Sequence, residues 1–153
     1  VRCRLLLDAQ SAYADAIRSV DPHWAAVSGV RVGEMYRVLH RDLMAIPPTE
    51  QAKTEQQKQL FYGIMHVRYR VLLEKGIEMM RRVIALGDQT TDAQIWIKRA
   101  EAQKKEMDLA LEDEKAAIAK MPFTEEELQK TLDIMKKSYE KKAAADNAKA
   151  DKK

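Results

Sequence analysis

Apolar residues recur every three to four positions through most of this chain, and strong helix breakers interrupt the pattern at only four places. The interruptions are Pro22, Pro47-Pro48, Gly87 and Pro122. Proline and glycine are the residues that most often end or restart a helix. The chain is therefore predicted to form long amphipathic helices that fold back on one another, and it contains no convincing strand pattern.

The four interruptions divide the chain into five predicted helices. They cover roughly residues 4–20, 22–45, one long segment of over thirty residues that ends at Gly87, then 91–120 and 125–142. We expect an all-α fold of about five antiparallel helices, in hairpins with elongated central helices and a basic C-terminal tail. The domains are predicted to be a helical domain over residues 1–122, a C-terminal helix over 123–145 and a disordered tail over 146–153.

Capping signals support three of these helix starts. Asp21 is a favoured N-cap and Pro22 suits the first helical position. A threonine followed three residues later by glutamine or glutamate forms a capping box, and this pattern occurs at Thr91 and again, with glutamate, at Thr124.

The charges indicate solvated helix faces and not a polyanion-binding surface. The chain has 27 lysines and arginines against 24 acidic residues, and the two signs are interleaved along most of its length. Residues 136–153 are the exception, because they carry seven lysines against three acidic residues. We interpret this lysine-rich tail as solubilising, with weak contact to an anionic surface as the alternative and no specific nucleic-acid binding.

No pattern of reactive residues indicates an enzyme, and we predict no catalytic residue, no cofactor and no metal site. None of the three histidines has a glutamate three residues before it, so the Glu-x-x-His pairs of di-iron bundles are absent. Cys3 is interpreted as an incidental thiol. The consecutive acids Glu112-Asp113-Glu114 point in different directions on a helix, so we expect them on a solvated face.

Large apolar residues allow two interpretations. Met65, Met79 and Met80 could form an adaptable groove for partner helices, but core packing is the favoured interpretation. Trp24 and Trp96 could anchor a partner on an exposed face, and here too we favour packing in the core.

Three segments resemble the tetratricopeptide repeat, a helical hairpin with small and large residues at fixed places. One segment looks like the second helix of a repeat, the next like a first helix, and the last like the second helix that follows it. These segments contain, in order, Ala9, Tyr13, Ala16 and Asp21-Pro22; Val32-Gly33 and Tyr36; and Gly76, Met80, Val83 and Gly87-Asp88. The small residues of such a pattern allow close helix approach. The match covers about a repeat and a half, and Gly29 stands where the family often has tryptophan.

A second resemblance is to the C-terminal regions of envelope repeat proteins from bacterial gliding-motility and related secreted assemblies. It depends on Asp21-Pro22-His23-Trp24, Arg31-Val32-Gly33-x-x-Tyr36, and Ile46-Pro47-Pro48 with the glutamine-rich helix after it. This resemblance implies a periplasmic or outer-membrane-associated adaptor, with a cytoplasmic location as the alternative.

These observations favour a non-enzymatic scaffold that binds a protein partner in an envelope assembly. By their places in the first-helix pattern, Glu34, Arg37 and Val38 are expected to line its binding face. Two alternatives stay open at this point. One is a self-associating bundle or coiled coil of the fourth and fifth helices, and the other is a carrier of a small ligand or metal.

Overall fold

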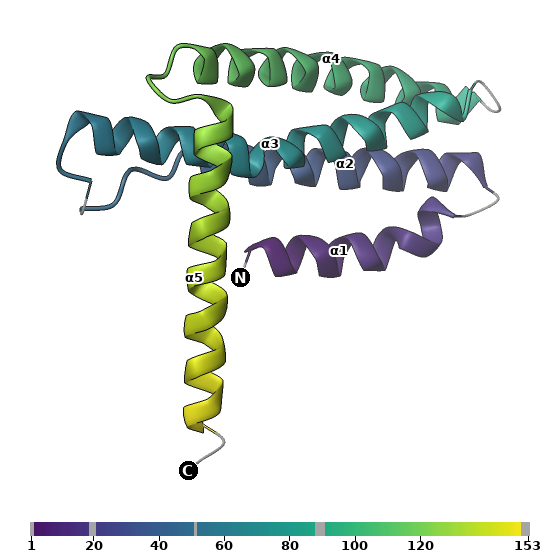
Figure 1. Cartoon of the computed structure of the whole chain (residues 1–153). Coiled ribbons are helices and arrows are strands. Elements are labelled where there is room, and N and C mark those ends of the chain that lie inside the picture. The colour runs from purple at the N-terminus through teal and green to yellow at the C-terminus, as the bar shows by residue number, and fades with distance from the viewer. Residues whose placement is uncertain (1, 19–20, 51, 88–90, 151–153) are drawn as a thin grey trace. The chain divides into compact units, whose positions relative to one another are not determined.

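The computed structural model describes residues 2–18, 21–50, 52–87 and 91–150, with side chains except those of 3, 91, 92, 142 and 144–150. These residues form five α-helices and no strand, which confirms the predicted all-α fold (Figure 1). The helices are α1 (Arg2–Ile17), α2 (Pro22–Met44), α3 (Glu55–Ala85), α4 (Thr91–Ala119) and α5 (Glu125–Ala150). Within the described part, no helix is both long and apolar enough to span a membrane.

The helix ends follow the local chemistry of the sequence. The Asp21 carboxylate accepts a hydrogen bond of 2.9 Å from the backbone N–H of His23, and Pro22 is the first residue of α2. Gly87 has a φ of +66°, the left-handed conformation that glycine adopts most readily at a helix C-terminus. At Thr124 the predicted capping box forms in both directions. The Thr91 side chain and Asp88 lie outside the described part of the chain.

The predicted length of α3, over thirty residues, is confirmed, because the helix has 31 residues; it starts at Glu55 through a capping box that was not predicted. The Thr54 hydroxyl accepts from the Gln57 N–H, and the Gln57 amide oxygen accepts from the Thr54 N–H. Two other helices differ from their predicted bounds, and one of them is α1, which runs from Arg2 to Ile17 and was predicted over residues 4–20. The α5 helix runs to Ala150, whereas helical order was expected to fade beyond Lys142. Alanine and lysine are strong helix formers, which favours this continuation even without an apolar stripe.

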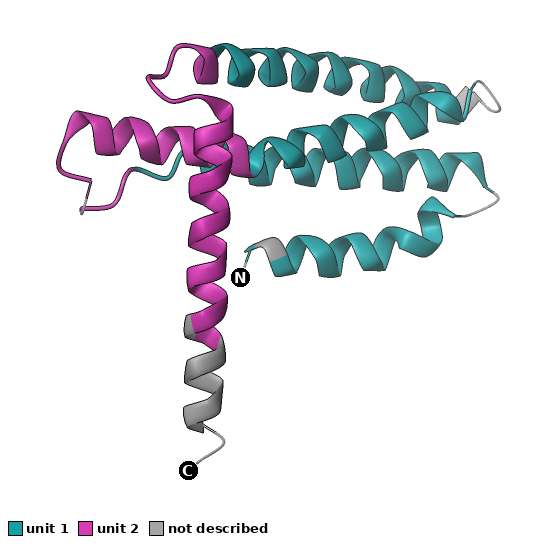
Figure 2. Cartoon of the chain, viewed as in Figure 1, with its two compact units in different colours: residues 1–47, 69–116 teal, residues 48–68, 117–153 magenta. Residues whose placement is uncertain are grey.

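The chain divides into two compact units, each assembled from segments that are distant in sequence (Figure 2). Unit 1 comprises residues 1–47 and 69–116, and unit 2 comprises residues 48–68 and 117–153. This division differs from the predicted boundary at residue 122. Segment 48–68, which contains the first half of α3, belongs with α5 and not with the rest of the N-terminal helices.

In unit 1, α1, α2, the second half of α3 and most of α4 lie roughly side by side and run in alternating directions (Figure 1). One buried cluster lies between α2, α3 and α4 and includes Val30, Leu73, Met80 and Met107. A second cluster lies between α1, α2 and α3. It contains Leu6, Val32, Tyr36, Leu39 and Met79. The α2 and α3 helices thus lie in the middle of the unit, with α1 and α4 on either side.

Glycines allow the central pair of helices in unit 1 to approach closely. A Cβ atom at Gly33 would lie 3.3 Å from the Gly76 carbonyl oxygen and 2.6 Å from the Met80 Cε. A Cβ atom at Gly76 would in turn lie 3.3 Å from the Gly33 carbonyl oxygen. The prediction that Gly33 and Gly76 permit close helix packing is therefore confirmed.

Met65, Met79 and Met80 are buried, which confirms the core interpretation of these methionines.

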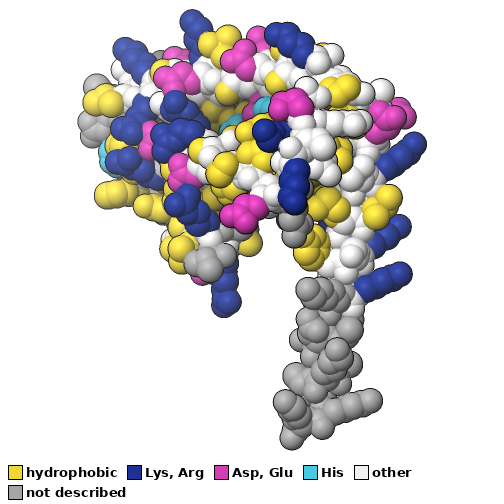
Figure 3. Space-filling model, turned by 90° about the vertical axis from the view of Figure 1, so that its left-hand side faces the viewer, with side chains coloured by type: hydrophobic (Ala, Val, Ile, Leu, Met, Phe, Trp, Pro, Cys, Tyr) yellow, Lys and Arg dark blue, Asp and Glu magenta, His cyan; other side chains and the backbone are white. Residues whose placement is uncertain are grey.

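Unit 2 has a small core of its own. It is formed by Val67, Ile118, Leu128 and Leu132, with Leu60, Ile64 and Phe123 packed against them. Its apolar stripe on α5 is only partly covered, because Tyr139 is 65% exposed. Lysine side chains project from the described part of α5 beside hydrophobic ones (Figure 3). Elsewhere on the surface seen in Figure 3, away from this helix, side chains of opposite charge are interleaved.

Candidate functional site

The surface of α2 that faces away from α3 lies in unit 1 between α1 and α4. On α2, the residues that pack inward include Ala26, Val30 and Gly33. The opposite surface of α2 carries charged or partly exposed side chains at positions 31, 34, 35, 37, 38 and 41, because the helix has a broad apolar face and a polar one. Two grooves follow this outward surface, one toward α1 and one toward α4.

The groove between α1 and α2, which we call the apolar groove, is open and has a volume of about 490 Å³. From α1 it is lined by Arg2, Leu5, Leu6 and Tyr13, and from α2 by Arg31, Glu34, Met35, Val38, Leu39 and Asp42. Leu6 and Leu39 are buried, whereas Leu5 is 60% exposed and Val38 is 44% exposed. The groove therefore has apolar side chains that the rest of the unit leaves uncovered.

The groove between α2 and α4, which we call the arginine groove, has a volume of about 290 Å³. It is lined by Glu34, Arg37, Val38, Arg41, Arg99 and Gln103. Glu34 and Val38 line both grooves, so the two grooves adjoin along α2. The three residues predicted for a binding face, Glu34, Arg37 and Val38, therefore lie together on the outward surface of α2. We call this surface, which lies between the two grooves, the wall.

Arginines connect α2 with α4 across the arginine groove. Arg37 donates to the Gln103 side-chain oxygen at 2.6 Å and lies 2.7 Å from the Glu106 carboxylate. Arg99 donates through Nε to Glu34 at 2.7 Å, and Arg31 donates to the same carboxylate at 3.2 Å. Each exposed ion pair contributes little alone, but a connected set restrains the spacing of the two helices. The function of this network within the fold is to hold the wall in place.

A tryptophan supports the same network from α4. The guanidinium carbons of Arg31 and Arg99 lie 5.6 Å and 5.5 Å from the centre of the Trp96 ring. This is the range of a cation–π interaction. Trp96 also packs against the core between α2, α3 and α4, as expected. Trp24 does not: it is 57% exposed at the start of α2, so the core interpretation of Trp24 was wrong. The rings of Trp24 and His23 are nearly perpendicular, with centres 5.2 Å apart.

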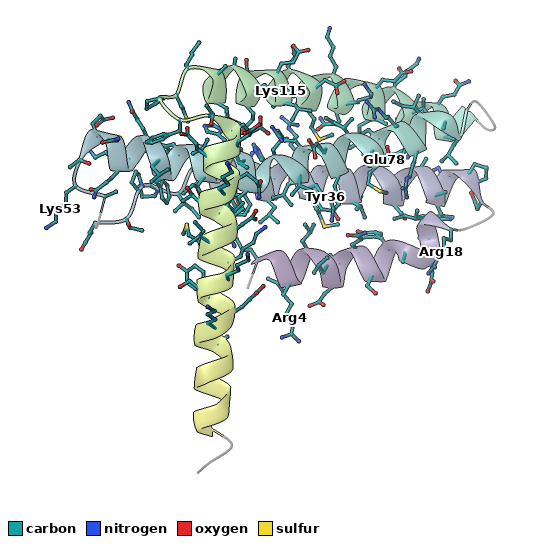
Figure 4. The ribbon with its side chains drawn as sticks, viewed as in Figure 1. Arg4, Arg18, Tyr36, Lys53, Glu78 and Lys115 are labelled. Atoms are coloured by element: carbon teal, nitrogen blue, oxygen red, sulfur yellow. The ribbon has the colours of Figure 1, made fainter. Side chains whose placement is uncertain are left out.

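On the α1 side, Tyr36 fixes the distance between α1 and α2. Its hydroxyl donates to the Gln10 side-chain oxygen at 2.6 Å, and Figure 4 shows where Tyr36 lies on α2. Burial raises the pKa of the Tyr36 hydroxyl, so it stays protonated and continues to donate at neutral pH. At the end of the apolar groove, Arg2 donates to Asp42 at 2.8 Å. Side-chain contacts therefore hold α2 against both α1 and α4 without a bound partner.

A buried histidine–glutamate pair joins α2 to α4 elsewhere in unit 1. His40 and Glu114 are each 7% exposed, and His40 Nε2 lies 3.1 Å from a Glu114 oxygen. The expectation that Glu114 lies on a solvated face was wrong. Its neighbours Glu112 and Asp113 are exposed, as expected from the rotation of successive side chains around a helix. The pair lines neither groove.

The apolar side chains and paired arginines of the two grooves can bind and position another molecule. Among the described residues, no three His, Cys, Asp or Glu side chains cluster in a way that could hold a metal ion. The Cys3 side chain lies outside the described part. Arg99 and Gln103, which line the arginine groove from α4, were not predicted from the sequence. Their spacing of four residues, with Glu106 three further on, indicates a shared helix face. It does not indicate that this face meets α2.

Comparison with known proteins gives no match of any kind: no family model, no curated protein and no solved structure matches the chain.

Proposed function

We propose that this chain is a non-enzymatic protein-interaction scaffold, and that a partner protein docks in the apolar groove. The observation that carries the proposal is the exposure of Leu5 and Val38 above a buried floor of Leu6 and Leu39. Apolar patches rimmed by polar residues commonly mark interaction surfaces. The groove is open and bordered by two helices, a form that suits a segment of another protein better than an enclosed small molecule.

The braced wall supports the same proposal. A surface that is already fixed loses less conformational freedom when it binds. The contacts of Arg37 with Gln103 and Glu106, and of Tyr36 with Gln10, fix α2 against both of its neighbours. Glu34 and Arg37 then act mainly as supports of the wall, and Val38 acts as the residue that touches the partner.

Capture of proteins from an extract of the native source tests this proposal with a matched pair of variants. Val38 and Val71 are both helix-interior valines that are 44% exposed, and Val71 lines neither groove. We expect that Val38→Asp loses proteins that the wild type and Val71→Asp retain, because a carboxylate in the groove loses solvation when a partner covers it. Circular dichroism serves to show that both variants fold.

Retention of the same proteins by all three forms would contradict the proposal. Loss of the same proteins from both variants would also contradict it, because the effect would then not depend on the groove.

A second candidate function is self-association through α5, and one observation favours it. Ile134 and Tyr139 are 69% and 65% exposed, and a groove of about 240 Å³ runs beside Leu132, Met135 and Tyr139. Light scattering over a hundredfold range of protein concentration tests this candidate. A mass that stays at that of the monomer throughout would exclude it.

The tetratricopeptide-like architecture and the envelope location stay predictions from resemblance. The close packing of α2 on α3 through Gly33 and Gly76 supports the first. Fractionation of the native cells, with detection of the chain by antibody, tests the predicted periplasmic or outer-membrane-associated location.

A further inference from the structure

We infer that the segment docking in the apolar groove is an amphipathic helix of another protein, with carboxylates along one flank of its apolar stripe. The inference rests on the proposed function and deepens it, because it names the chemistry of the partner. It is carried by the length of the groove, the charges around it and the side on which those charges lie.

The length of the groove corresponds to a short helix. Its lining residues extend from Arg2 to Tyr13 on α1 and from Arg31 to Asp42 on α2. Each of these spans covers eleven residue steps, or about 16 Å at 1.5 Å per residue. A partner helix of about three turns is as long as the groove and would present apolar residues at i, i+3 or i+4, and i+7. Such residues would cover Leu5 and Val38.

The charges around the two grooves favour an acidic partner. Arginine provides all of the positive charge, from positions 2, 31, 37, 41 and 99. Among the described side chains, three acids, Glu34, Asp42 and Glu106, pair with these five arginines. Glu34 is shared by Arg31 and Arg99, and Asp42 is shared by Arg2 and Arg41.

Sharing leaves donors free, because each guanidinium has five N–H groups. Arg41 makes the longest ion-pair contact of the five arginines: its guanidinium lies 3.4 Å from the Asp42 carboxylate, and its side chain is 72% exposed. A carboxylate of a partner can bind such a guanidinium through two parallel hydrogen bonds. A lysine at the same place would be repelled, and charges of this kind select a partner more than they add affinity.

The excess of positive over negative charge lies on the side of α2 that faces α4, because two arginines and two acids line the apolar groove. Three arginines, at positions 37, 41 and 99, line the arginine groove, against Glu34 in its lining and Glu106, which pairs with Arg37. At the α1 border, in contrast, Arg2 is paired with Asp42 at 2.8 Å. The carboxylates of the partner are therefore expected on the flank that faces α4.

A second copy of this chain fits the groove less well. The partly uncovered apolar stripe on α5 contains Ile134 and Tyr139, and Lys136, Lys137 and Lys141 lie between or beside them. Figure 3 shows lysines projecting beside hydrophobic residues along this helix. A helix with this charge would bring lysines toward the arginines of the groove.

Fluorescence anisotropy with three labelled 14-residue peptides and the full chain tests the inference. All three have the same alanine-rich helical frame. The first carries leucine at positions 2, 5, 9 and 12 with glutamates on one flank, the second has lysine in place of each glutamate, and the third has serine in place of each leucine. We expect the acidic peptide to bind at least about tenfold more tightly than the lysine peptide at low salt. The difference shrinks at high salt, which screens exposed charges, and the serine peptide does not bind.

Two arginines provide a matched pair for charge reversal. Arg41 and Arg18 are 72% and 74% exposed, and each contacts one nearby aspartate. Arg18 lies at the other end of α1 from Arg2 and points away from α2 (Figure 4). We expect Arg41→Glu to lower the affinity of the chain for the acidic peptide by about fivefold or more. Arg18→Glu is expected to leave this affinity unchanged within about twofold. Val38→Asp is expected to abolish binding.

Several outcomes overturn the inference and leave the proposed function standing. They are equal binding of the acidic and lysine peptides, no binding of any peptide, equal effects of Arg41→Glu and Arg18→Glu, and binding that survives Val38→Asp. A dimer of the chain that Val38→Asp dissociates would also overturn it, because the occupant would then be a second copy. The proposed function fails separately if Val38→Asp changes none of the proteins captured from the extract.

Discussion

At the residue scale, the hydrogen bonds between Thr124 and Glu127 fix the start of α5. The Glu127 carboxylate accepts from the Thr124 backbone N–H at 2.8 Å and from its hydroxyl at 3.0 Å. The Thr124 hydroxyl oxygen accepts from the Glu127 N–H at 3.3 Å. The backbone and then the side-chain hydrogen bond from Thr124 lower the pKa of Glu127 below its ordinary value of 4.5. The ionised form is thus favoured in the folded chain.

The lowered pKa of Glu127 predicts a dependence of stability on pH. The ionised carboxylate stabilises the folded state above about pH 4.5, and this stabilisation is lost as the pH falls through the lower folded pKa. Glu127→Gln keeps a capping residue but removes the charge. We expect the wild type to exceed the variant in free energy of unfolding at neutral pH and this difference to narrow in acid. Urea unfolding at a series of pH values measures it, and a constant difference would contradict the prediction.

At the scale of a helix, α3 depends on a capping box that its sequence displays as Thr54-Glu55-Gln56-Gln57. The hydrogen bonds between Thr54 and Gln57 satisfy backbone groups that have no partner within the helix. Gln57 accepts from the backbone N–H of Lys53 as well, at 2.9 Å. This single turn orders the chain after the Pro47-Pro48 break.

Thr54→Ala is expected to lower the free energy of unfolding by about 1 kcal/mol, the usual loss when a threonine cap is removed. Thr49→Ala is the matched control, because Thr49 is also an exposed threonine in the segment before α3 and makes no side-chain cap among the described contacts. Urea unfolding followed by circular dichroism compares the two. The cap would be unimportant if both variants lost the same stability, or if neither lost any.

Helices and their ends could be predicted because they depend on neighbours in sequence. Asp21, Gly87 and Thr124 each act on residues within one turn, so their effects are visible in the sequence itself. The contact of His40 with Glu114 could not be foreseen, because it depends on the position of α4 against α2. The candidate wall shows both cases: Glu34, Arg37 and Val38 were predicted from one helix, whereas the contributions from α4 and α1 were not.

At the scale of the whole molecule, the chain builds two separate cores on shared helices. Buried Leu73 belongs to the core of unit 1, and buried Leu128 belongs to that of unit 2. The two clusters have no residue in common. Yet α3 contributes residues to both, because unit 2 contains its part up to Arg68 and unit 1 contains the remainder. Separate cores on continuous helices raise the question of whether the units open independently.

A pair of leucine-to-alanine variants addresses this question. Leu128 is 0% exposed and Leu73 is 1% exposed, so each substitution leaves a cavity and is expected to lower stability by about 2–5 kcal/mol. If the units open separately, Leu128→Ala speeds amide hydrogen exchange in residues 55–68 and in α5 but leaves α2 protected. Leu73→Ala produces the reverse pattern. Mass spectrometry of peptides from the exchanged protein distinguishes the two regions. Faster exchange throughout the chain in both variants would mean that α3 couples the cores into one cooperative unit, because no segment could then open without the other.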